Sequence, residues 1–230
     1  LEKFKHVCIK NNILSKNDFL KLEKSISDEI DEDALWAEKQ NDPEDSTLNL
    51  FVEEKKFDSD IVLKENDVVL VDAINHAMDE ELEFNDKMLV FGQDVAGGKG
   101  GVFTATKGLT DKFGEDRVFN SPLAESSIIG TAIGLATLGY KPVVEIQFGD
   151  YIWTSMMQIR NELATMNYRS NGDWQCPVVV RVPVGGYIHG SLCHSQSIDG
   201  YFTHLPGIMI AYPSNAADAK GLLKAACRMN

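Results

Sequence analysis

Residues 118–148 read VFNSPLAESSIIGTAIGLATLGYKPVVEIQF, and this stretch decides the fold. The apolar pair at 118–119 predicts a short strand, and Pro122 predicts a turn directly after it. Residues 125–138 form an apolar run of helical length, and residues 142–148 are typical of a buried strand. A strand, a helix and a second strand in this order predict parallel strands joined by a right-handed crossover.

The same alternation continues on both sides of this stretch. The remaining elements are expected as helices at about 67–84 and 151–168, as strands at 88–91, 178–182 and 208–212, and as a last helix capped by Ser214. Short apolar strands that alternate with helices indicate strands buried on both faces. We therefore expect an α/β fold with a doubly wound, mostly parallel sheet.

The N-terminal part of the chain has a different pattern. Ser15 and Asp18 have the spacing of a capping box at the start of a helix. Apolar residues then recur at three- and four-residue steps, as in an amphipathic helix: Phe19, Leu22, Ile26 and Ile30. This helix is expected to end near Pro43. We predict a helical extension over residues 1–57 and an α/β domain over residues 58–230.

Composition and charge exclude several classes of partner. The formal net charge is −13, with acids concentrated in residues 27–45, which argues against nucleic acid or an anionic membrane surface as a partner. No apolar run reaches the roughly 18 residues of a membrane span. The four cysteines form no Cys-x-x-Cys pair, which favours a reduced, cytoplasmic compartment over a disulfide framework or zinc site. Because it begins at Leu1, we expect the chain to be part of a longer protein.

The carboxyl ends of the predicted strands share one edge of the sheet, where ligands bind in open α/β folds. Several candidate site residues follow these ends: Gln93, Asp94, Leu123, Glu125, Tyr151 and His194. We expect an acid, an aromatic ring and a histidine to converge on this rim. The rim is therefore the predicted binding or catalytic site.

Glu125 is the first residue of the predicted helix 125–138, and glycines follow at positions 130 and 134. An acid in the first turn faces the positive end of the helix dipole, which favours the carboxylate, while burial favours the neutral acid. A group between these influences can take or give a proton. A first-turn acid that only complements the dipole is the commoner case, so spacing alone leaves both roles open. The two glycines permit close approach of another helix.

Other groups on the rim have ordinary interpretations too. His194 lies in a loop bracketed by glycines, where it could donate a proton, contact a substrate or be only structural. His189 shares no helical face with it and no carboxylates cluster nearby, so no metal site is expected. Tyr151 is consistent with packing as well as with a ligand platform. The glycine-rich loop 97–101 lacks the ending of a phosphate loop and is expected to be a flexible or tightly turning connection.

Taken together, these segments resemble a known family. The matching runs are FGQDV (91–95), GGVF (100–103), KFGEDRVF (112–119), SPLAE (121–125), KPVVEIQF (141–148), HSQS (194–197) and HLPG (204–207). They are similar to the beta subunit of branched-chain and pyruvate-type 2-oxoacid dehydrogenases, in one register over about residues 66–230. The run NILS at 12–15, with its acidic helix, resembles the tail of the alpha subunit of the same enzyme, which suggests a piece of a fused chain.

The resemblance implies the pyrimidine domain of a thiamine-diphosphate-binding fold and a role for each matching residue. Glu125 should bond the aminopyrimidine ring of the cofactor and help to activate the thiazolium carbon. Leu123 should line the same pocket, and Tyr151 should stack on the pyrimidine. His194 should face the substrate and the incoming lipoyl group. Gln93 is a departure, because the family usually has an acid there and glutamine cannot relay a proton.

The resemblance also implies partners. The family holds the diphosphate and Mg²⁺ through a segment of the alpha part that does not occur in these 230 residues, so we expect no turnover by this chain alone. The parent would include an alpha part and a second beta copy. It would oxidatively decarboxylate a 2-oxoacid and pass the acyl group to the lipoyl-lysine of an acyltransferase.

Substrate and location are implied less directly. The run EIQFGDYI at 145–152 favours a branched-chain substrate such as 2-oxoisovalerate. The alternatives are a pyruvate or acetoin dehydrogenase, or a non-catalytic assembly module. The resemblance implies the bacterial cytoplasm, or the mitochondrial matrix in a eukaryote.

Overall fold

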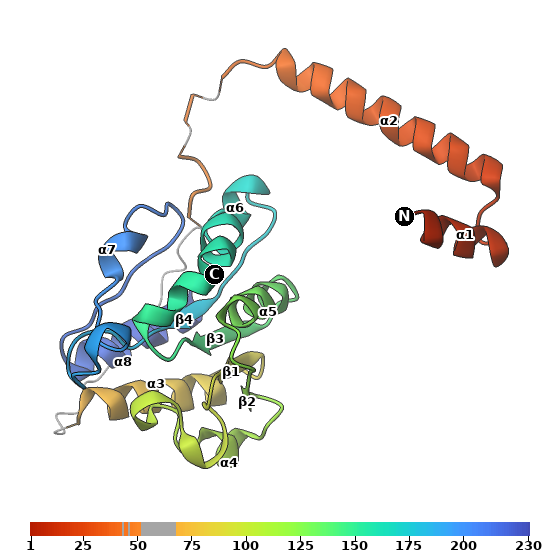
Figure 1. The fold of residues 1–230 in the computed structure, drawn as a ribbon. Coiled ribbons are helices and arrows are strands. Elements are labelled where there is room, and N and C mark those ends of the chain that lie inside the picture. The colour runs from red at the N-terminus through yellow and green to blue at the C-terminus, as the bar shows by residue number, and fades with distance from the viewer. Residues whose placement is uncertain (43, 46, 52–67) are drawn as a thin grey trace. The chain divides into compact units, whose positions relative to one another are not determined.

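The computed structural model describes residues 1–42, 44–45, 47–51 and 68–230 (Figure 1). The chain divides into two compact units, Leu1–Ser46 and Thr47–Asn230. The predicted boundary between residues 57 and 58 lies outside the described residues, and so remains a proposal. None of the helices in the described ranges has the length and apolar character needed to cross a membrane.

The N-terminal unit is a pair of helices, α1 (Glu2–Lys10) and α2 (Lys16–Glu38). The predicted capping box is present, because the Asp18 N–H donates to Ser15 Oγ at 3.1 Å and the Ser15 N–H donates to Asp18 Oδ2 at 3.0 Å. Sequence periodicity did not predict α1. An ion pair between Lys5 and Glu23 joins α1 to α2.

The α/β unit contains one described sheet of four parallel strands: β1 (Met88–Gly92), β2 (Val118–Asn120), β3 (Lys141–Glu145) and β4 (Val179–Arg181). The strand order is β2-β1-β3-β4. β1 pairs in parallel with β2 and β3, and β3 pairs in parallel with β4. The expected parallel α/β architecture is thereby confirmed.

The predicted fifth strand at 208–212 is wrong. These residues form no strand, and Met209, Ile210 and Tyr212 are exposed. An apolar, β-branched run has the composition of a strand, but a strand forms only where a neighbouring backbone is available to pair with it. No described strand pairs with this run.

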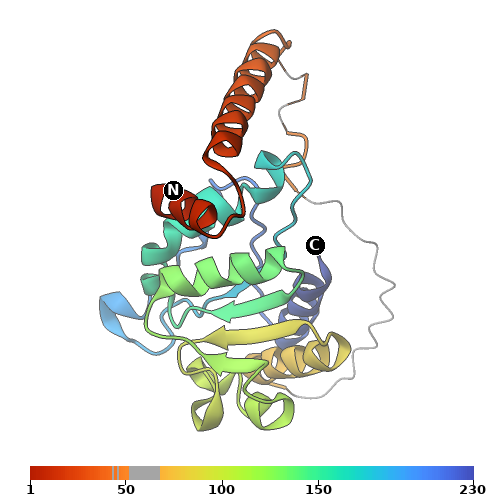
Figure 2. The ribbon, with the colours of Figure 1, turned by 90° about the vertical axis from the view of Figure 1, so that its right-hand side faces the viewer.

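Helices cover both faces of the sheet (Figure 2). The α-helices of this unit are α3 (Leu70–Phe84), α4 (Leu109–Phe113), α5 (Glu125–Thr137), α6 (Met166–Arg169), α7 (Asp199–Phe202) and α8 (Ala216–Arg228). Helix α5 lies over one face, while α3 and α8 pack together on the other (Figure 2). Asn215 caps α8 by accepting a hydrogen bond from the Asp218 N–H at 2.8 Å, so the predicted cap at Ser214 is one residue early.

The helix predicted over 151–168 is instead three pieces. Residues Gly149–Ser155 form a 3-10 helix, Gln158–Leu163 a π-helical turn, and α6 follows. Hydroxyl groups compete for the backbone here, because Ser155 Oγ donates to the Ile152 carbonyl at 2.7 Å. Short 3-10 turns also form at Gly97–Lys99, Val102–Thr104 and Ser191–Cys193.

The core has two layers, one on each side of the sheet. Leu89 and Phe91 of β1 belong to the layer beneath α5, while Met88 and Val90 belong to the layer beneath α3 and α8. This division follows from the two-residue period of a strand. Because both faces are covered, every residue of β1 and β3 is buried.

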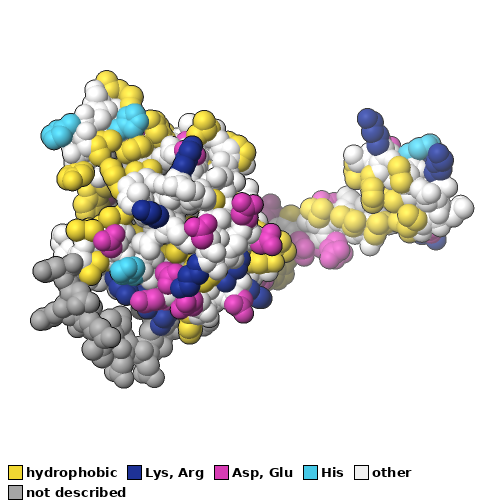
Figure 3. All heavy atoms as spheres, turned by 90° about the horizontal axis from the view of Figure 1, so that it is seen from below, with side chains coloured by type: hydrophobic (Ala, Val, Ile, Leu, Met, Phe, Trp, Pro, Cys, Tyr) yellow, Lys and Arg dark blue, Asp and Glu magenta, His cyan; other side chains and the backbone are white. Residues whose placement is uncertain are grey.

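The outer surface of the α3 side carries charged groups in pairs. Figure 3 shows acidic and basic side chains intermixed on the α/β unit as seen from below. Glu80 of α3 pairs with Lys220 and Lys224 of α8, and Lys112 of α4 pairs with Asp79 of α3. These pairs are only partly buried, so each contributes little to stability.

Candidate functional site

The strand order places a topological switch point between β1 and β3. The chain leaves β1 toward β2 on one side and leaves β3 toward β4 on the other. In open α/β sheets, ligands bind beside such a point, at the carboxyl ends of the strands. Gln93 follows β1 directly. Gln147 and Phe148 follow β3, and the Gln147 amide donates to the Gln93 carbonyl at 3.5 Å.

Glu125 lies at this edge of the sheet, half-buried, as the first residue of α5. Its Oε1 accepts a hydrogen bond from Gln93 Nε2 at 2.9 Å, and its Oε2 accepts one from Thr154 Oγ1 at 3.3 Å. The Gln93 side chain is only 3% exposed, so its amide is held in place. Both carboxylate oxygens are therefore oriented by neutral donors, and the start of α5 favours negative charge at the same point.

Tyr151 and His194 meet at the same edge. The Tyr151 hydroxyl and His194 Nε2 lie 2.7 Å apart. The Phe148 ring packs edge-on against His194, with ring centroids 4.6 Å apart and planes at 79°. The structure thus brings together Gln93 and Glu125 in one bonded pair and Tyr151 and His194 in another.

Leu123, Asp150 and Asp94 also lie near this edge, but none of them contacts Glu125 or His194 through a hydrogen bond of its side chain. Leu123 is 82% exposed, so its predicted place in a pocket lining stays a prediction. Asp150 does not cap its helix. Its Oδ2 accepts a hydrogen bond from the Gln196 N–H at 3.4 Å, which ties the 3-10 helix to the His194 loop. Asp94 pairs with Lys99 at 2.8 Å in the glycine-rich loop.

Sequence reasoning missed three groups at this edge. Phe148 and Thr154 both contact predicted site residues, and Ser126 Oγ donates to the Thr154 carbonyl, which joins α5 to the 3-10 helix. Phe148 was missed because the strand was predicted to run to residue 148, whereas β3 ends at Glu145 and leaves Phe148 beyond its carboxyl end. Nothing in the local pattern distinguishes Thr154 from any other exposed helical threonine.

A buried ion pair beneath the rim was also missed. Glu145 of β3 and Arg181 of β4 are register partners and form an ion pair, and Glu145 Oε1 accepts a hydrogen bond from the Val102 N–H at 2.9 Å. Burial lowers the pKa of Arg181 to about 10. The end of the glycine-rich loop is therefore fastened to β3, which favours a tightly turning connection over a flexible one. The sequence signal for this ion pair was a charged residue of each sign, Glu145 and Arg181, at the end of a short apolar run.

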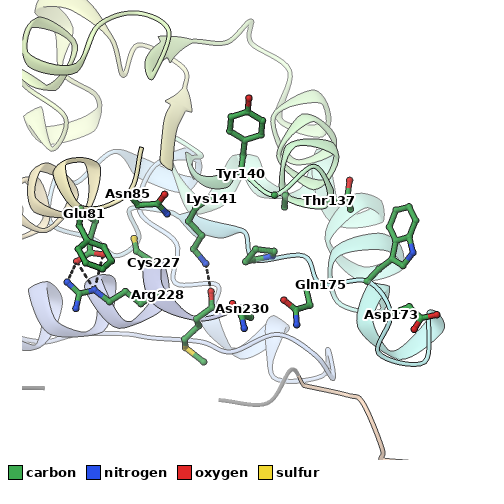
Figure 4. A pocket seen from close by; sticks show the side chains of 16 residues that line it. Glu81, Asn85, Thr137, Tyr140, Lys141, Asp173, Gln175, Cys227, Arg228 and Asn230 are labelled. Carbon is green, nitrogen blue, oxygen red and sulfur yellow. Dashed lines mark hydrogen bonds and ion pairs between the residues drawn. The ribbon is translucent and has the colours of Figure 1, made fainter. Parts of the chain in front are cut away.

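A cavity of about 790 Å³ lies at the end of β3 opposite to the Glu125 rim, and Figure 4 shows the side chains that line it. Lys141, the first residue of β3, lies in it, and its ammonium group donates to the Met229 carbonyl at 2.8 Å. Burial raises the pKa of the Cys227 thiol to about 12 and that of Cys176 to about 11. Both cysteines are therefore unreactive thiols at neutral pH. This cavity has no part in the Glu125 site.

Within the described ranges, no group of three or more His, Cys, Asp and Glu side chains is placed to hold a metal ion. The polar groups around Glu125 and His194 are instead a carboxylate, two amides, two hydroxyls and an imidazole. Such a set is suited to hydrogen bonding with an organic ring and to proton transfer.

Comparison with known proteins agrees with this geometry. Residues 67–230 match the family model described as transketolase, pyrimidine binding domain. The chain belongs to this family. The pyrimidine-binding domain accordingly accounts for all of the sheet and for the rim that carries Glu125.

Several curated relatives of this domain are beta subunits. The 2-oxoisovalerate dehydrogenase subunit beta of Bacillus subtilis is 54% identical over 158 residues, which is 69% of this chain and 48% of the relative. The pyruvate dehydrogenase E1 component subunit beta of the same organism is 47% identical over 163 residues, 71% of this chain and 50% of the relative. The chain spans about half the length of the curated relatives it matches.

A solved structure supports the fold alone. The chain is similar to one described as "Split gene transketolase, inactive beta4 tetramer", with a TM-score of 0.53 and 24% identity. The similarity covers 70% of this chain and 47% of that chain. The pyrimidine-binding domain of this chain therefore shares its fold with that transketolase structure.

The residues present fit the pyrimidine end of thiamine diphosphate. A half-buried carboxylate with both oxygens fixed can bond a ring nitrogen. The Tyr151 ring, which packs perpendicular to Phe148 with centroids 6.0 Å apart, can offer its face to a flat heterocycle. The donor set thus agrees with the family of this domain.

Proposed function

We propose that this chain is the pyrimidine-binding part of a thiamine-diphosphate-dependent 2-oxoacid dehydrogenase. The parent would oxidatively decarboxylate a branched-chain 2-oxoacid and transfer the acyl group to lipoyl-lysine. The observation that carries the proposal is the Glu125 carboxylate, held at the switch point by Gln93 and Thr154. The 54% identity to a 2-oxoisovalerate dehydrogenase subunit beta supports the same reading.

Each rim residue has a proposed part in the chemistry. Glu125 bonds a ring nitrogen of the pyrimidine and exchanges a proton with it. Gln93 holds that carboxylate without charge of its own, so the proton has no second acid at this position to move to. Tyr151 and Leu123 contact the pyrimidine, and His194 faces the substrate. When bound, the cofactor supplies an electron sink that lets carbon dioxide leave.

The proposal includes partners that complete the site. An alpha part would hold the diphosphate and Mg²⁺, a second beta copy would assemble with the first, and a lipoyl-bearing acyltransferase would accept the acyl group. Residues 1–57 would be the tail of that alpha part. Such complexes operate in the bacterial cytoplasm or the mitochondrial matrix, and curated relatives include a Dictyostelium discoideum protein whose name specifies mitochondrial.

Pyruvate is the alternative substrate, because a pyruvate dehydrogenase subunit beta is 47% identical to this chain. Acetoin is a further candidate. The assay that separates them is kcat/KM of the full-length parent, with its alpha part, for 2-oxoisovalerate, pyruvate and acetoin. A higher value for 2-oxoisovalerate supports the branched-chain proposal.

Glu125→Gln in that parent tests the function itself. The substitution keeps the shape of the side chain but removes its ability to exchange a proton, so decarboxylation should fall by at least about 100-fold. Asp111→Asn is the matched control, because Asp111 is also an acid in the first turn of a helix, α4, and is exposed. If Glu125→Gln decarboxylates as well as Asp111→Asn does, the chain is a non-catalytic assembly module.

A further inference from the structure

The contact between Tyr151 and His194 joins two segments that are remote in sequence. Tyr151 lies on the 3-10 helix after β3, and His194 lies in the loop that follows β4. Their polar atoms, the phenol oxygen and imidazole Nε2, are 2.7 Å apart, the length of a strong hydrogen bond. Nothing in the proposed stacking of Tyr151 on a pyrimidine requires this bond.

We propose that Tyr151 is a positioning residue that donates its hydroxyl proton to Nε2 of His194 and so holds the imidazole as its Nδ1–H tautomer. A neutral imidazole carries one proton on two nitrogens, and the partner of one nitrogen decides which of them has it. A phenol, with a pKa of about 10, is a better proton donor than a neutral imidazole N–H. The proton of the bond therefore belongs to the tyrosine.

Packing prevents the imidazole from turning away from this bond. The Phe148 ring stands edge-on at 4.6 Å from His194, and the Tyr151 ring stands at 5.5 Å and 82°. On the remaining side, a Cβ added at Gly190 would lie 2.4 Å from His194 Cβ. The Gly190 N–H also donates to Ser195 Oγ at 2.9 Å, which closes the loop around the histidine.

The consequence is a free donor at the rim. In the part of the chain that the structure describes, Tyr151 is the hydrogen-bond partner of His194, and Nδ1 has none. The Nδ1–H is thus available to an oxygen of a 2-oxoacid, whether its keto group or its carboxylate. This last step rests on the proposed function, whereas the tautomer itself does not.

The first test reads the tautomer directly, by ¹⁵N NMR of the 230-residue chain labelled at histidine, with His194→Gln used to assign the signal. We expect protonated Nδ1 and unprotonated Nε2 in the wild type. Tyr151→Phe keeps the ring but removes the hydroxyl, so the proton should redistribute between the two nitrogens. A wild-type proton on Nε2, or a spectrum that Tyr151→Phe leaves unchanged, overturns the proposal.

Two loop glycines provide a matched pair for the same measurement. Gly190→Ala should displace His194 and abolish the defined tautomer. Gly186→Ala should leave it intact, because an added Cβ at position 186 has nothing within 4 Å. Equal spectra for the two alanine variants would show that packing does not hold the imidazole, and would contradict the proposal.

The second test uses the full-length parent and a double-mutant cycle. Tyr151→Phe should lower kcat/KM for the 2-oxoacid by about 10-fold, the effect of one lost hydrogen bond of this kind, while the KM for thiamine diphosphate stays within about twofold. In a His194→Gln background the same change should have no further effect. An additive effect contradicts positioning through His194. If the parent decarboxylates no 2-oxoacid, the proposed function fails, and the NMR result still decides the tautomer.

Discussion

At the scale of single residues, Lys141 is a cation buried in the interior of the α/β unit. It begins β3 with a side chain only 7% exposed, and its ammonium group bonds a single backbone carbonyl, that of Met229. Burial lowers the pKa of Lys141 to about 8. A buried cation without a carboxylate partner is costly, so its charge state must influence stability.

The sign of that influence is defined. Below pH 8, Lys141 is protonated in both the folded and unfolded chain, and the cost of burying its charge is fully present. Between pH 8 and the unfolded value of 10.5, the folded lysine releases its proton first, so the free energy of unfolding rises with pH. Cys227 and Cys176 have the opposite effect from about pH 8 upward, because burial raises their pKa values above the unfolded value of 9. Between pH 8 and 9 the two thiols offset part of the gain, so the contribution of Lys141 over this window is the difference between the wild type and a variant that lacks Lys141.

We predict that the contribution of Lys141 over this window is a gain of about 1 kcal/mol in unfolding free energy. Lys141→Met should abolish it, as measured by urea denaturation at pH 8 and pH 9. Lys107→Met is the control, since Lys107 is exposed. If the unfolding free energy of Lys141→Met rises with pH as much as that of the wild type, another group causes the rise.

At the scale of secondary-structure elements, the close approach of β1 and β3 depends on one glycine. A Cβ at Gly92, the last residue of β1, would lie 2.5 Å from the carbonyl oxygen of Glu145, the last residue of β3. This contact lies at the carboxyl ends of the two strands, one residue before Gln93, which bonds Glu125. The absent side chain is thus part of the geometry of the site.

Gly92→Ala should therefore destabilise the domain by about 1–3 kcal/mol, the usual effect of forcing an extra carbon into a packed interior. Gly134→Ala, in the middle of α5 with nothing within 4 Å, should have the opposite sign and stabilise by about 0.5–1 kcal/mol through helix propensity. Thermal unfolding of both variants measures the contrast. Equal shifts in the same direction would show that β1 and β3 separate without strain.

At the scale of the whole α/β unit, α3 and α8 are locked together by a buried charge. Arg228 donates to Glu81 through Nη2 at 2.6 Å and Nε at 3.0 Å, across 147 residues of sequence, and Glu81 is 1% exposed. Lys224 stands 3.8 Å from the same carboxylate. Removing one partner of such a pair leaves an uncompensated buried charge.

Arg228→Met should therefore reduce the unfolding free energy by about 2–3 kcal/mol, less than a fully buried pair loses, because Lys224 remains. Lys112→Met, which removes an exposed cation from Asp79 and Glu83, should change it by less than about 1 kcal/mol. Chemical denaturation of both variants provides the comparison. If both variants lose a similar amount of unfolding free energy, other groups or water stabilise the Glu81 carboxylate in the absence of Arg228.

Local pattern was sufficient for the parts of this protein that depend on neighbours in sequence. Strand and helix periods predicted β1 to β4, α3 and α5, because burial on one or two faces leaves a period of 2 or 3.6 in the residues themselves. The capping box at Ser15 is a contact between residues three apart. The strand-end rule then located Gln93 and Glu125 on one rim, since parallel strands all end at the same edge.

Tertiary structure alone decided what depends on distant partners. Residues 208–212 lack a strand to pair with, and Leu123 is exposed although it lies two residues before a half-buried acid. The bond between Tyr151 and His194 depends on how two loops from neighbouring strands meet. A hydrogen bond between two strands, or between two side chains, requires both partners to be in place. The periodicity of a segment reports only whether that segment is buried, and not which distant segment lies beside it.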